Sequence, residues 1–111
     1  MGVMLATTRF AVRRSQVVKD PHGTRSASGW GPAELERPGR VVEEPEEDGE
    51  QDGPGQWVLG LDPVVWPLRA RDLVVEPSTG REWTVVTAAR RAHAVEASVG
   101  WVRAVCVLRP A

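Results

Sequence analysis

Apolar residues alternate with polar ones in short stretches of this chain, with the period of two that is typical of β-strands. Phe10 and Val12 share one face of the segment 7–19, which predicts one or two short strands there. The segment 26–32, SASGWGP, lacks this alternation and is predicted to be a loop in which Trp30 is an anchor. A Pro38-Gly39 turn is expected after it.

The second half of the chain shows a more regular pattern. The segment 56–62, QWVLGLD, alternates and predicts a strand. A bend with two prolines leads to a strand at 72–76, and its partner strand is expected at 81–88. The residues between them, 77–80, read PSTG and predict a tight turn, because Pro and Gly suit the early and the left-handed turn positions.

The end of the chain predicts one more strand. The segment 88–97 is expected to be an extended loop or a frayed continuation of the flanking strands, since it has no clear apolar stripe for a helix. The segment 98–109, SVGWVRAVCVLR, has apolar residues on both faces, so the core is expected to cover one face and a partner or a loop the other. Five or six short strands without a helix indicate a small barrel or sandwich, here a single-domain β-barrel of 111 residues, because closure removes open strand edges.

Charge is distributed unevenly along the chain. Residues 34–52 hold nine acidic residues against two arginines, a local charge of −7, while the other residues hold twelve basic and six acidic ones, a local charge of +6. The segment 43–56 has too few apolar residues to order itself alone and is expected to be a flexible acidic loop between strands. Its acidic residues are Glu43, Glu44, Glu46, Glu47, Asp48, Glu50 and Asp52.

No catalytic or metal-binding motif stands out. His22 and His93 have no second ligand at metal-binding spacing, and Cys106 alternates with valines, as a buried structural thiol would. Neither a signal peptide nor a membrane span of about 20 apolar residues is expected. We therefore expect no enzyme, no cofactor, no metal and no membrane association.

Tryptophan and arginine are the candidate interface residues, because interfaces are enriched in both. Trp57 and Trp83 are expected in the core, and for Trp101 core packing is an equal alternative. The arginines could contact phosphates or the acidic rim of a partner; a solvated edge in an Arg-rich chain is an equal alternative. The candidates are Arg13, Arg14, Trp66, Arg69, Arg71, Arg90, Arg91 and Trp101.

Several short motifs together resemble the head-to-tail stopper, or head-closure, proteins of long-tailed bacteriophages, especially those of actinobacteria. They are the D-x-H-G turn at Asp20–Gly23, Pro38-Gly39 ahead of a charged loop, the bend at Pro67–Asp72, and the V-V…G-R-x-W-x-V-V hairpin at Val74–Val86. A closing strand rich in Val and Arg follows them.

The resemblance implies a small β-barrel without catalytic residues, located at the neck of the virion after assembly in the host cytoplasm. Copies of the chain would form a ring, expected to be a hexamer, below the portal and its adaptor. The ring would retain packaged DNA, which passes through its channel, and offer a platform to the tail terminator or tail tube protein. The acidic loop would then face the channel and repel DNA, or dock on an Arg-rich neighbour and order on assembly.

The alternative interpretation is a small SH3-like barrel that binds a peptide or a nucleic acid. An aromatic groove would favour it, and Trp66 with Trp83 is the sequence feature that hints at one.

Overall fold

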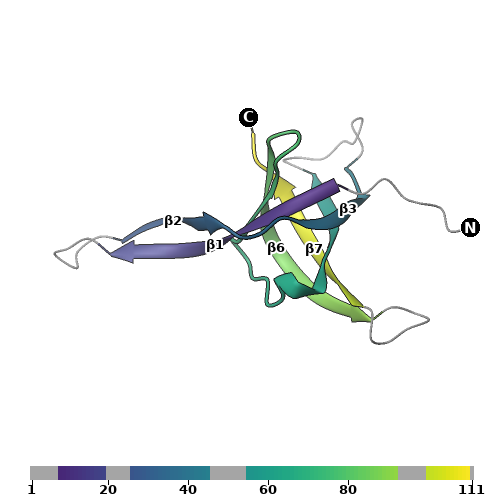
Figure 1. Cartoon of the computed structure of the whole chain (residues 1–111). Helices are drawn as coiled ribbons and strands as arrows, with labels where there is room; N and C mark the ends of the chain where they lie inside the picture. Colours follow the sequence, from purple (N-terminus) through teal and green to yellow (C-terminus); the bar gives the residue numbers. More distant parts are fainter. Residues whose placement is uncertain (1–7, 20–25, 46–54, 93–99, 111) are drawn as a thin grey trace, which may run out of the picture.

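The structure, a computed structural model, describes residues 8–19, 26–45, 55–92 and 100–110. These residues form seven strands and one short 3₁₀ turn (Figure 1). The elements are β1 (Thr8–Lys19), β2 (Ser26–Ala33), β3 (Arg37–Glu43), β4 (Gln56–Leu61), η1 (Pro63–Val65), β5 (Leu73–Glu76), β6 (Arg81–Ala92) and β7 (Gly100–Leu108).

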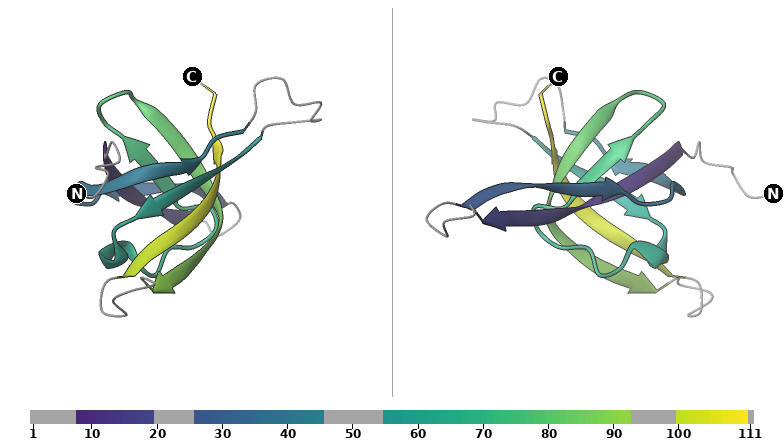
Figure 2. Two further views of the ribbon diagram at one scale, coloured as in Figure 1. Left: turned by 90° about the vertical axis from the view of Figure 1, so that its right-hand side faces the viewer. Right: turned by 60° about the vertical axis from the view of Figure 1, so that its left-hand side comes forward.

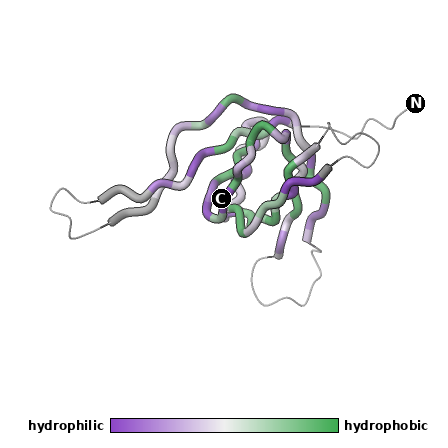
Figure 3. The backbone as a smooth tube through the Cα atoms, turned by 90° about the horizontal axis from the view of Figure 1, so that it is seen from below, coloured by the Kyte–Doolittle hydropathy of each residue, from purple (hydrophilic) through white to green (hydrophobic). Residues whose placement is uncertain are grey.

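Six of these strands close into an antiparallel barrel, which confirms the predicted fold class. The order around the barrel is β1–β3–β4–β7–β6–β5, and β5 pairs back onto β1 through residues 11–13. Figure 3, seen from below, shows the strands closing into a ring in which the hydrophobic residues concentrate. Because the ring is closed, no barrel strand leaves a whole edge unpaired.

The remaining strand, β2, forms an arm with the second half of β1. Residues 15–19 of β1 pair with residues 26–30 of β2 and, among the described residues, with no other strand. This two-stranded ribbon runs away from the barrel (Figures 1 and 2). The molecule is correspondingly elongated, with principal extents of 59 × 38 × 24 Å.

The core is built around three aromatic rings inside the barrel. Trp83 is fully buried and meets the rings of Phe10 and Trp57 edge to face, at centroid distances of 5.8 and 5.4 Å. Ala104 and Cys106 point inward from β7, and their small side chains leave room for these large rings. The prediction that Trp57 and Trp83 lie in the core is confirmed.

The predicted hairpin is present. β5 pairs with β6 across a turn at residues 77–80, in which Gly80 has a φ of 78°. The predicted alternation of β7 also holds, since Val102, Ala104 and Cys106 are buried. Residues 88–92 continue β6 as strand, in agreement with the expected continuation of the flanking strands, and residues 93–97 lie outside the described residues.

Two sequence predictions are wrong. The segment 26–32 is not a loop but most of β2. Its Gly- and Ser-rich sequence has low strand propensity, but hydrogen bonding to β1 stabilises it as a strand. Pro38-Gly39 is not a turn but lies inside β3. A Cβ on Gly39 would lie 2.7 Å from both the Gly60 carbonyl oxygen and the Phe10 ring, so glycine permits a close passage of backbone here.

Candidate interaction surfaces

The described residues offer no cluster of metal-ligating side chains. They hold no group of three His, Cys, Asp or Glu side chains that could bind a metal ion. Burial raises the pKa of the Cys106 thiol to about 12, so this thiol is neutral and inert near neutral pH. Within the same residues, no helix has the length and apolarity needed to cross a membrane.

Arg14, a candidate interface residue, connects the base of the arm to the barrel through hydrogen bonds. Its Nε and Nη2 donate to the Glu34 carboxylate at 2.9 and 3.1 Å, and Nη2 also donates to the Val65 carbonyl at 2.9 Å. A further bond goes to the Pro67 carbonyl. The hydrogen bond to Glu34 raises the pKa of Arg14 above its ordinary value. The Arg14 guanidinium is therefore engaged in contacts within the chain.

Asp72 anchors the same region from inside. It is buried, and its carboxylate accepts hydrogen bonds from the backbone N–H of Ser15 at 2.8 Å and of Arg69 at 2.9 Å. Arg14 lies 3.5 Å from the same carboxylate. Because β1 leaves β5 at this point, Asp72 satisfies the first N–H that the barrel no longer pairs. The predicted bend at Pro67–Asp72 is thus held by its last residue.

Trp30 fixes the base of the arm to the barrel. Its indole Nε1 donates to the Arg71 carbonyl at 2.7 Å, and the Arg109 guanidinium stacks 4.6 Å from its ring. Arg13, another candidate interface residue, donates to the Gly31 and Trp30 carbonyls at 2.7 and 3.3 Å. The expectation that Trp30 is an anchor holds, although it lies on a strand.

Two further candidate arginines, Arg69 and Arg71, lie near Trp30, and the backbone of Arg71 is strained. Arg71 has a φ of 78°, a conformation that costs a residue with a side chain about 1 kcal/mol. Its carbonyl accepts the Trp30 bond and its N–H donates to the Val85 carbonyl at 2.8 Å, so two contacts hold the strained backbone. Arg69 is exposed nearby. The structure thus gathers Arg14, Arg69 and Arg71 around one loop.

The other candidates form two separate pairs. The Arg90 guanidinium stacks 5.6 Å from the partly buried Trp66 ring, which packs against the core. Arg91 on β6 is the cross-strand partner of Trp101 on β7. Directly paired residues share one face of a sheet, so Arg91 and Trp101 both point outward, opposite to the buried Val102.

Trp101 is the centre of an apolar and basic surface on the outside of the barrel. A Cβ on Gly60 would lie 3.3 Å from both the Trp101 ring and the Val42 side chain, so this ring lies across β4. Arg40 and Arg103 are the cross-strand partners of Gly60 on its two sides. We call this surface the Trp101 face; it comprises Arg40, Val42, Glu43, Val58, Gly60, Arg91, Trp101, Arg103 and Val105.

The Trp101 face is partly exposed, and its arginines form no ion pair within the residues that the structure describes. Val42 is 38% exposed, and Trp101, Arg103 and Val105 are half-buried. Across the described part of the chain, no acidic side chain forms an ion pair with Arg40, Arg91 or Arg103. The prediction that the core covers one face of this strand is confirmed, and the prediction that a partner or a loop covers the other face stays a prediction.

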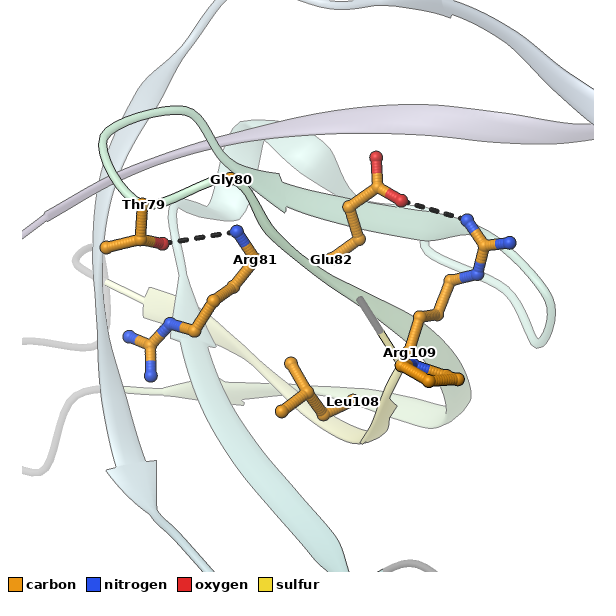
Figure 4. A pocket seen from close by; sticks show the side chains of 7 residues that line it. Thr79, Gly80, Arg81, Glu82, Leu108 and Arg109 are labelled. Carbon is orange, nitrogen blue, oxygen red and sulfur yellow. Dashed lines mark hydrogen bonds and ion pairs between the residues drawn. The ribbon is translucent and has the colours of Figure 1, made fainter.

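A hollow between the β5–β6 turn and the end of β7 was missed from the sequence (Figure 4). Arg81 pairs with Glu76 at 2.8 Å, and Arg109 pairs with Glu82 at 2.9 Å. Burial raises the pKa of Glu76, but hydrogen bonds from Thr79 and Arg81 outweigh it, and the net pKa is lowered. Since both arginines are already neutralised, the hollow has little excess charge for a ligand. Its walls are Thr79, Gly80, Arg81, Glu82, Leu108, Arg109 and Pro110.

The acidic segment lies between the end of β3 at Glu43 and the start of β4 at Gln56. Glu43 and Glu44 are exposed at the end of β3. The other candidates of this loop lie outside the described residues, and they are Glu46, Glu47, Asp48, Glu50 and Asp52.

Comparisons with known proteins add no assignment. No protein-family model, curated protein or solved structure matches this chain.

Proposed function

We propose that this chain is a structural protein of the bacteriophage neck, a head-to-tail stopper. Copies of it would form a ring below the portal and its adaptor, retain packaged DNA and offer a platform to the tail. The observation that carries the proposal is a closed barrel with a projecting two-stranded arm, an acidic β3–β4 connection and the β5–β6 hairpin that the resemblance includes.

The arm supports an assembly role. A two-stranded ribbon is marginally stable alone, and its outer edges present unpaired backbone groups. Trp30, Arg13 and Arg14 hold the base of the arm against the barrel. A projecting ribbon whose edges pair with no further strand among the described residues suits contact with another subunit, by strand addition or by packing.

The acidic loop has two proposed roles within a ring. Several copies facing the channel would create a negative field that repels DNA phosphates within a Debye length of about 8–10 Å. Alternatively, each loop would dock on a basic neighbour. Changing the seven loop acids to Asn and Gln separates the two roles: intact assembly with altered DNA release supports the channel role, and lost assembly supports docking.

The SH3-like binding module is less well supported. Trp83 is fully buried, so Trp66 and Trp83 do not line an aromatic groove at the surface. The hollow of Figure 4 has an apolar wall at Leu108, but its arginines are paired within the chain. Neither feature selects a peptide or a nucleic acid.

Electron microscopy of particles made by the parent phage with this gene disabled tests the proposal. We expect DNA-filled or leaking heads beside finished, unattached tails. Supplying the wild-type gene in trans should restore complete virions, which controls for effects on neighbouring genes. Normal virions from the disabled phage would refute the neck assignment and favour a binding module.

A further inference from the structure

The strand β3 has an open edge along its second half. On one side, residues 39–43 of β3 pair with β4, with a bulge between Val41 and Glu43. On the other side, residues 37–39 pair with the start of β1, and within the described ranges residues 40–43 pair with no strand there. Alternate residues of an antiparallel strand direct their N–H and C=O groups to opposite sides, so part of these groups face the open edge.

An exposed apolar side chain lies at this edge. Val42 is 38% exposed on the outside of the barrel, where its Cγ2 lies 3.3 Å from the Cβ that an alanine at Gly60 would carry. Val41, its neighbour, packs against the core from the inside. The edge therefore presents backbone groups without a strand partner beside an apolar residue, which is the kind of surface that an added strand covers.

The register of β1 directs the preceding residues toward this edge. Thr8, the first residue of β1, is opposite Gly39, and the start of β1 lies beside β3 in Figures 1 and 2. In this antiparallel pair, each step back along β1 advances one residue along β3. If the pairing continues, residues 7, 6 and 5 come opposite residues 40, 41 and 42.

The amino acids at these positions suit the two faces of such an extension. Directly opposite residues share one face of a sheet. Ala6 would therefore share the inner face with Val41, where a small apolar residue fits beside the core. Leu5 would share the outer face with Val42 and cover its exposed side chain. The segment 1–7, MGVMLAT, has no charged side chain that the pairing would have to bury.

We infer that residues 5–7 extend β1 and occupy the open edge of β3 in the same chain. The occupant is the chain's own segment because Thr8 already holds it at the edge, so it joins without closing a loop. A strand from another molecule would also lose translational and rotational freedom. The extension protects this edge from strand addition by other chains. The inference concerns a single copy and does not rest on the proposed function.

Disulfide trapping in the full chain tests the pairing. In the variant Leu5→Cys with Val42→Cys, the two Cβ atoms should lie about 4.5–5.5 Å apart, close enough for a disulfide after a small shift. Mild oxidation of dilute protein should therefore cross-link most molecules internally, as measured by mass spectrometry and a non-reducing gel. Cys106 is buried and does not compete for the disulfide.

Two control variants test position and register. Leu5→Cys with Val86→Cys uses another exposed valine, on β6, which β4 and β7 separate from β3. Ala6→Cys with Val42→Cys places the two thiols on opposite faces of the sheet. Both controls should cross-link much more slowly. Cross-linking of either control as fast as Leu5→Cys with Val42→Cys would mean that the segment has no fixed register, and the inference would be wrong.

Amide hydrogen exchange tests the same pairing without a new cysteine. A chain that lacks residues 3–7 should remain a folded barrel by circular dichroism. Among residues 40–42, the amides directed away from β4 should exchange about tenfold faster in this shortened chain, because each loses a hydrogen bond of about 0.5–1.5 kcal/mol. The amides of β7, which pairs with β4 and β6, are the internal reference and should be unchanged.

Two further results would overturn the inference. A disulfide between two copies of Leu5→Cys with Val42→Cys, seen as a dimer in dilute protein, would mean that another molecule supplies the strand. Equal exchange of residues 40–42 in the full and the shortened chain would mean that residues 5–7 leave the edge open.

Discussion

Replacing Asp72 with alanine should destabilise the protein more than removing any exposed carboxylate. Its carboxylate is buried and accepts the backbone N–H groups of Ser15 and Arg69 at 2.8 and 2.9 Å. A hydrogen bond to a charged group contributes about 1.5–3 kcal/mol, and both donors would lose their partner together. The contact to Arg14 is long, at 3.5 Å, and partly exposed, so it adds little.

The expected loss for Asp72→Ala is therefore about 3–5 kcal/mol, out of a total stability of about 5–15 kcal/mol for a typical domain. Urea unfolding followed by tryptophan fluorescence measures it. Asp62→Ala is the matched control, because Asp62 accepts one N–H, that of Val64 at 2.8 Å, at a partly exposed turn. Its loss should be about 1 kcal/mol. A loss below about 1 kcal/mol for Asp72→Ala would refute the anchoring role.

Three further predictions concern single sites. Gly80→Ala should cost about 1 kcal/mol in a thermal melt because φ is 78° there, whereas Gly29→Ala, equally open but without a positive φ, should not. Iodoacetamide should label Cys106, whose burial raises its pKa to about 12, only as fast as the chain unfolds, and rapid labelling of the folded chain would contradict this. The lowered pKa of Glu76 contributes stability above the ordinary value of 4.5 that is lost as the pH falls through the lowered pKa. The deficit of Glu76→Gln should therefore be largest near neutral pH and shrink in acid, and a deficit independent of pH would refute the assignment.

Local pattern was sufficient for the regular part of the fold. The alternation in β4 and β7 and the turn chemistry at residues 77–80 predicted the strands, the hairpin and the burial of Trp57 and Trp83. These features depend on side-chain period and on turn residues, which are properties of neighbouring positions. β2 was missed because its strand conformation depends on pairing with β1, a partner that its own residues do not specify.

The candidate surfaces were predicted only in part. Arg91 and Trp101 were named from composition, and the register of β6 and β7 places them side by side. Arg14 was named as an interface residue, but its contacts reach carbonyls and carboxylates 20 to 58 positions away in the sequence.

The sequence by itself determined the all-β character of the chain, the burial of Trp57 and Trp83 and the turn at residues 77–80, because alternation and turn residues are properties of neighbouring positions. Only the tertiary structure decided that six strands close, that the arm leaves the barrel at Asp72, and that Arg91 and Trp101 lie side by side on the outside of the barrel. The physical reason is that barrel closure, the anchoring of the arm and the strand register depend on contacts between residues distant in the sequence. Those contacts are selected by packing and hydrogen bonding of the whole chain.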